Sequence, residues 1–138
     1  MLMHKAKFPA QFRYLDEIRE YVAGVAIKAG FDSKEVYSIQ LATDEAASNI
    51  IEHAYEGISD GVIEIACGMS GKNLTITLHD HGKPFDPSSV RPPNLKASLS
   101  ERQIGGLGIY LMRKLMDEVH YKSLPTGGNI LTLVKRRG

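Results

Sequence analysis

The chain has 138 residues, of which 43% are hydrophobic and 24% are charged, as in a globular protein that can bury its own core. The 17 lysines and arginines are balanced by 16 aspartates and glutamates, so composition gives no sign of the basic surface that nucleic-acid-binding domains carry. The single cysteine, Cys67, excludes an internal disulfide and a cysteine-rich zinc site. We expect it to be a small buried residue.

The sequence has no apolar run of membrane-spanning length, and its first residues lack the apolar core of a signal peptide. We therefore expect a cytoplasmic protein, with residues 1–138 forming a single domain. The one local basic run, Lys135-Arg136-Arg137, is interpreted as a solvated segment.

The first half of the chain predicts a strand followed by two helices. Residues 2–8 alternate loosely and favour a short strand. Apolar residues then recur at helical spacing over about 11–29. Asp32 or Ser33 is expected to cap a second helix that continues to near Gly57.

The middle of the chain predicts an antiparallel hairpin followed by a long loop. Residues 62–67 and 74–78 read as strands joined by a tight turn. Residues 84–103 hold four of the six prolines and show little periodicity, and loops of this length in a compact domain are usually functional.

The last third predicts an amphipathic helix over 107–116 and a hairpin formed by 119–124 and 130–134. Together the elements predict an α+β fold of two layers. It consists of a mostly antiparallel sheet of about five strands with helices packed on one face.

A glycine cluster opens the third predicted helix. Gly105, Gly106 and Gly108 surround Leu107, where the amphipathic run begins. Glycines at a helix start expose backbone N–H groups and the positive end of the helix dipole, which suits phosphate. The cluster matches neither the P-loop nor the dinucleotide fingerprint, and a loop that only needs small residues is the alternative interpretation.

Glu45 and Asn49 lie four residues apart and therefore on one face of the second predicted helix. Carboxylate and carboxamide oxygens on one face can hold a hard cation such as Mg²⁺, or position a hydroxyl or a water. The polar rim of an amphipathic helix gives the same pattern, because Asp44, Glu52 and His53 are polar as well.

Asp80-His81-Gly82 closes a predicted strand and enters the long loop. The Asp80 carboxylate can accept a hydrogen bond from the exocyclic amine of adenine, and Gly82 lets the backbone approach a ligand without a Cβ in the way. A plain Asp/Gly turn is the alternative. We interpret His81 as a solvent-facing turn residue rather than as a ligand or an acid/base group.

Residues 45–55, 80–87 and 105–112 resemble, in this order, three sequence boxes of the GHKL ATPase/kinase superfamily, which includes gyrase, Hsp90, histidine kinases and MutL. The likeness covers nearly the whole chain. It is greatest to the small anti-sigma-factor branch, the bacterial serine-protein kinases of partner-switching systems. The resemblance implies the Bergerat-type ATP-binding fold.

The resemblance also implies a role for each matching residue. Asn49 would hold the Mg²⁺ that bridges the phosphates of ATP. Glu45 would activate a serine hydroxyl of a partner protein. Asp80, with Gly82 beside it, would bind adenine.

The third box would supply a hinge and a phosphate-cradling turn, formed by Gly105, Gly106, Leu107 and Gly108. This turn would close a lid that consists of residues 87–104. Arg102 in that lid is a candidate phosphate contact, with an exposed loop cation as the alternative.

Two departures from the superfamily pattern affect the prediction. Pro84 stands where histidine kinases usually have a second glycine, which favours the anti-sigma-like branch. Ile130 stands where relatives often place a threonine beside the adenine-binding aspartate, so we expect one adenine-side hydrogen bond to be missing. The sequence shows no phospho-accepting histidine helix.

The resemblance implies an anti-sigma factor that is also an ATP- and Mg²⁺-dependent serine kinase. Its substrate would be a small, STAS-type anti-sigma factor antagonist, and it would sequester a sigma factor or another regulator, with no direct contact to nucleic acid or membrane. A homodimer is expected, and the polar face around Arg19 is a candidate docking surface. The alternatives are a module that binds ATP and a partner without catalysis, and an ATPase fragment of a larger machine.

Overall fold

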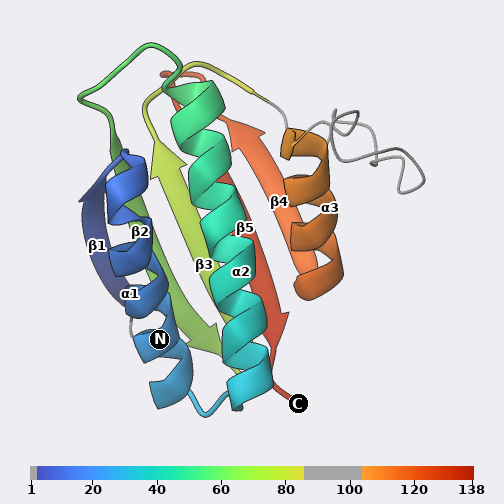
Figure 1. The fold of residues 1–138 in the computed structure, drawn as a ribbon. Helices are drawn as coiled ribbons and strands as arrows, with labels where there is room; N and C mark the ends of the chain where they lie inside the picture. The colour runs from blue at the N-terminus through green and yellow to red at the C-terminus, as the bar shows by residue number, and fades with distance from the viewer. Residues whose placement is uncertain (1–2, 86–103) are drawn as a thin grey trace.

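The computed structural model describes residues 3–85 and 104–138, which form one five-stranded sheet with three α-helices side by side on one face (Figure 1). Every strand pair is antiparallel, and the order across the sheet is β1-β2-β3-β5-β4. The predicted two-layer α+β fold is therefore confirmed.

The strands agree closely with the sequence prediction. They are β1 Met3–Pro9, β2 Val62–Ser70, β3 Asn73–Asp80, β4 Glu118–Ser123 and β5 Asn129–Arg136. The helices are the short 3-10 turn η1 Phe12–Tyr14, α1 Leu15–Lys28, α2 Ser33–Asn49 and α3 Ile104–Leu115. None of the helices in the described ranges has the length and apolar character needed to cross a membrane.

The second helix begins at a capping box and ends in a wider turn. The Asp32 side chain accepts a hydrogen bond from the Glu35 backbone N–H at 2.7 Å, and the Glu35 carboxylate accepts one from the Asp32 N–H at 2.9 Å. After α2, Ile50–Ala54 continues as the π-helical turn η2. Such turns often occur near functional sites, and this one directly follows Asn49.

One apolar core lies between the helices and the sheet. Fully buried side chains come from both layers: Ile18, Val22, Ile39, Ile50, Ile63, Ile65, Leu74, Ile76, Leu78, Leu131 and Leu133. Cys67 of β2 is buried among them as predicted, and burial raises the pKa of its thiol to about 12. Along β3 and β5 the buried apolar side chains alternate with mostly polar ones, which lie on the face of the sheet away from the helices.

The basic run near residue 136 does not behave as the sequence predicts. Lys135 Nζ donates to the carbonyl of Leu115 at the end of α3, at 2.8 Å, and Arg137 Nη1 donates to the carbonyl of Ala29 at the end of α1, at 2.7 Å. The prediction of a solvated segment is wrong for Lys135 and Arg137, because each of these two cations occupies the negative end of a helix, where carbonyls lack helical partners. Arg136 is exposed, as predicted.

Candidate functional site

The three sequence boxes meet at one end of the molecule. Figure 1 shows the end of α2, the end of β3 and the start of α3 at the same end of the two-layer fold. The α2 helix packs between α1 and α3, which places it in the middle of the helical layer (Figure 1). The backbone segments that carry the three boxes therefore lie at one end of the fold.

The turn after β3 lies directly against the end of η2, the π-helical turn that follows α2. The Lys83 backbone N–H donates to the Ala54 carbonyl at 2.9 Å. A Cβ on Gly82 would lie 2.2 Å from the oxygen of that carbonyl, far inside van der Waals contact. Gly82 is thus required by the packing of this turn on η2. The expectation that it also makes room for a ligand stays a prediction.

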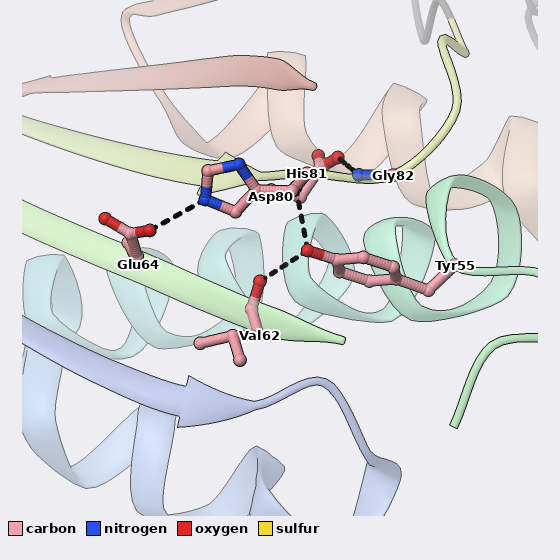
Figure 2. A network of polar contacts seen from close by, with 6 residues as sticks. All are labelled: Tyr55, Val62, Glu64, Asp80, His81 and Gly82. Atoms are coloured by element: carbon pink, nitrogen blue, oxygen red, sulfur yellow. Dashed lines mark hydrogen bonds and ion pairs between the residues drawn. The ribbon is translucent and has the colours of Figure 1, made fainter. Parts of the chain in front are cut away.

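The Asp80 carboxylate is held in a fixed orientation inside the fold. The residue is only 1% exposed, and its Oδ1 accepts hydrogen bonds from the Gly82 N–H and from Asn129 Nδ2, both at 2.9 Å (Figure 2 shows the first). Burial raises the pKa of this carboxyl, while these two hydrogen bonds act in the opposite direction. Both bonds end on Oδ1, so Oδ2 is the oxygen left for a ligand amine.

Asn129 is the site residue that sequence reasoning missed. It is 1% exposed, and besides Asp80 its Nδ2 donates to the Lys83 carbonyl at 3.0 Å. Its Oδ1 accepts from the Tyr121 hydroxyl at 2.5 Å and from Ser123 Oγ at 3.0 Å. This side chain links β3, β4 and β5 and fixes the Asp80 carboxylate.

The expectation for Ile130 is wrong. In the β3–β5 register, Asp80 lies opposite Asn129, and Ile130 lies opposite His79. Ile130 lines a hollow on the face of the sheet away from the helices. The alternation of β5 contained this signal, because Asn129 shares its face with Leu131 and Leu133.

Asn49 and Glu45 lie one turn apart on α2. Asn49 is 3% exposed, and its Nδ2 has no hydrogen-bond partner among the described residues. A buried amide without a partner is costly, and rotating it by 180° would present its oxygen at the same place. An amide that is available in this way fits the phosphate–Mg²⁺ role expected of Asn49.

Glu45 is half-buried. Burial raises the pKa of its carboxyl, and the neighbouring acids Asp44 and Glu52 raise it further. A carboxylate with raised proton affinity is suited to accept a proton at neutral pH. Asp44 is held by Arg19 Nη1 at 2.8 Å. Because Arg19 also pairs with Asp16, its guanidinium is engaged within the fold.

The third box differs in detail from the prediction. The α3 helix begins at Ile104, so Gly105, Gly106, Leu107 and Gly108 form its first turns and do not precede it. The predicted phosphate contact Arg102 and the lid residues 87–103 lie outside the described residues.

The chain matches the family model of the histidine kinase-like ATPase domain over residues 8–135. The chain belongs to this family. Membership in an ATPase family implies that the chain uses ATP, and it confirms the resemblance that the sequence showed.

Two curated serine-protein kinases are similar to most of this chain. The chain is 33% identical over 121 residues to the serine-protein kinase RsbW of Bacillus subtilis (strain 168), covering 85% of this chain and 76% of the relative. It is 35% identical over 117 residues to the serine-protein kinase RsbW of Bacillus cereus (strain G9842), covering 82% and 72%.

Solved structures show the same fold in the family. The RsbU and RsbW domains of a Mycobacterium tuberculosis protein match with a TM-score of 0.69 at 19% identity, covering 99% of this chain and 33% of that one. The histidine kinase domain of a blue-light activated kinase from Erythrobacter litoralis matches with a TM-score of 0.58 at 18% identity, covering 94% and 62%.

Proposed function

We propose that this chain is an ATP-dependent protein serine kinase that also acts as an anti-sigma factor. The observation that carries the proposal is the pair on α2: a buried Asn49 amide whose Nδ2 has no partner among residues 3–85 and 104–138, one turn from a Glu45 carboxyl of raised pKa. The relatives named serine-protein kinases, similar over more than four fifths of this chain, support the same reaction.

The arrangement suits phosphoryl transfer, which depends on alignment and charge neutralisation more than on covalent chemistry by the protein. In our proposal Asp80 Oδ2 accepts a hydrogen bond from the amine of adenine, and Asn49 would hold Mg²⁺ beside the phosphates. The metal, when bound, neutralises phosphate charge. The turn formed by residues 105–108 offers backbone N–H groups at the start of α3 to the phosphates.

Glu45 takes the proton in this mechanism. The incoming serine Oγ forms a bond to the terminal phosphorus of ATP as the bond to the bridging oxygen breaks and ADP leaves. The serine proton passes to the Glu45 carboxylate, whose raised pKa favours its acceptance. Arg19 keeps Asp44 paired, so Glu45 is the less tightly engaged of these two adjacent carboxylates.

We propose a STAS-type anti-sigma factor antagonist as the protein substrate. Phosphorylation adds about −1.5 to −2 charges to a serine and would weaken its contact with the kinase. The kinase would then hold its second partner, a sigma factor or another regulator. In this proposal the protein works in the cytoplasm, as a homodimer.

The test compares phosphate transfer with partner binding. Labelled ATP and Mg²⁺ are incubated with the chain and with STAS-domain proteins from the same organism, and transfer to serine is measured. We expect Glu45→Ala to lower transfer by a factor on the order of 10²–10⁴ while partner binding is retained. The matched control is Glu52→Gln, an acid on the adjoining turn, which should keep transfer within a few-fold.

The competing function is a module that binds ATP and a partner without catalysis. It predicts that no partner is phosphorylated and that Glu45→Ala has no effect on regulation. Either result would replace the kinase proposal.

A further inference from the structure

A second group of possible ligands lies on the other face of the sheet. Glu64 of β2, His79 of β3 and His81 just beyond β3 bring one ligand atom each to within 4.8 Å of one another. His81 Nε2 and Glu64 Oε1 are 2.8 Å apart, and Figure 2 draws this contact as a dashed line. The sequence predicted an exposed His81, and it is 57% exposed, but its ring is paired across the sheet surface.

His79 is the unusual member of this group. Its Nε2 is buried and has no hydrogen-bond partner among the described residues. Its ring centroid lies 4.6 Å from that of His81. A buried imidazole nitrogen without a partner forgoes a hydrogen bond that it would have in water, and nothing in the nucleotide site uses it.

We propose that Glu64, His79 and His81 bind a divalent transition-metal ion of the Zn²⁺ class. Two imidazoles and one carboxylate form a ligand set that zinc commonly takes, with a fourth position left for water or an anion. Tetrahedral zinc with bonds near 2.1 Å places its ligands about 3.4 Å apart. Rotamer adjustments of the exposed His81 and Glu64 side chains can supply this closer approach.

The ligand chemistry separates this site from the one proposed at Asn49. Imidazole nitrogen favours zinc, copper, nickel and cobalt, whereas Mg²⁺ prefers oxygen ligands. The two sites also lie on opposite faces of the sheet. Side chains alternate along a strand, so Asp80 faces the helices while His79 and His81 face the other way. The metal proposal therefore does not rest on the kinase proposal.

The backbone that carries the ligands is held in place. The His81 N–H donates to the Tyr55 hydroxyl at 2.7 Å, and that hydroxyl donates to the Val62 carbonyl at 2.7 Å (Figure 2). Tyr55 thus ties the segment bearing His81 to the start of β2, the strand that carries Glu64. Such supporting contacts fix the orientation of metal ligands.

Nearby lysines limit the affinity. Lys5 and Lys7 line the same hollow of about 500 Å³ as Glu64 and His79, and Lys7 lies opposite Glu64 in the β1–β2 register. Their positive charges oppose a divalent cation, with a strength that depends on salt. We therefore expect a dissociation constant for Zn²⁺ on the order of micromolar.

The test is calorimetric titration of the metal-free, tag-free chain with Zn²⁺, together with the visible absorption of bound Co²⁺. We expect one ion per chain, and His79→Ala and His81→Ala should each lower the affinity at least about 10-fold. The matched control is His120→Ala. His120 also pairs with a carboxylate, Glu118, at 2.9 Å on the sheet, but is not part of the group.

Three results would overturn the proposal. The first is absence of binding at a Zn²⁺ concentration 100 times the expected dissociation constant. The second is unchanged Zn²⁺ affinity in His79→Ala, and the third is an equal loss of affinity in the His120→Ala control. If His79→Ala fails to fold by circular dichroism, His81→Ala decides the question, because this exposed side chain contributes little to the core.

Discussion

Replacing Gly82 by alanine tests how the turn after β3 is held on the end of η2. The added Cβ would lie 2.2 Å from the Ala54 carbonyl oxygen and 2.5 Å from its carbon. Both are backbone atoms, so no side-chain rotation can relieve the contact. To reach even 3.0 Å from the oxygen, the turn must move by about 0.8 Å.

The cost of this movement can be estimated from two contributions. Overpacking of this kind costs about 1–3 kcal/mol, and loss of the hydrogen bond from the Lys83 N–H to Ala54 adds about 1 kcal/mol. We therefore expect Gly82→Ala to lower the free energy of unfolding by about 2–4 kcal/mol. For a chain of this length, that corresponds to a fall in Tm of about 7–14 °C.

Thermal unfolding followed by circular dichroism measures the effect, with Gly24→Ala as the matched control. Gly24 lies inside α1, and a Cβ there would meet nothing within 4 Å, so this variant should gain about 0.5–1 kcal/mol. ATP affinity should fall in Gly82→Ala, because the Gly82 N–H donates to Asp80. A Gly82→Ala Tm within about 2 °C of the wild type would refute the reasoning.

Two further predictions concern buried groups. In Asp80→Asn the amide oxygen can still accept hydrogen bonds from Gly82 and Asn129, but an N–H₂ group takes the place of Oδ2. Calorimetry should therefore show an ATP affinity about 10- to 100-fold weaker, with the fold retained. An affinity within about 3-fold of the wild type would exclude Oδ2 as the adenine acceptor. Cys67, whose pKa burial raises to about 12, should not react with a thiol reagent at pH 8 in the folded chain and should react fully in denaturant; rapid labelling of the native chain would contradict its burial.

The architecture could be predicted because the local signals agree with one another. The Asp32 capping box, the alternation of residues 74–78 and the helical spacing of α1 each point to the element that forms. Agreement of local preference with tertiary packing is what makes such elements readable from sequence. The start of α3 was missed by three residues, since helix boundaries are set by tertiary contacts as much as by propensity.

The parts of the site that could not be predicted depend on contacts between distant residues. Neither composition nor spacing indicates that Arg137 ends on the Ala29 carbonyl, or that Gly82 lies against Ala54. The sequence prediction put Ile130 beside Asp80, where the structure has Asn129, because strand register, not sequence order, decides which residue faces Asp80. The catalytic roles of Glu45 and Asn49 stay predictions.

The place of β5 in the sheet has a consequence for how the protein is made. Although it is the last strand in chain order, it lies between β3 and β4 and brings Asn129 to Asp80. During synthesis, everything up to β4 leaves the ribosome before the strand that brings Asn129 to Asp80. Pairing between strands far apart in the sequence is slow, so a nascent chain should acquire its hold on ATP only after β5 has joined the sheet, and nucleotide capture would report that this strand is in place.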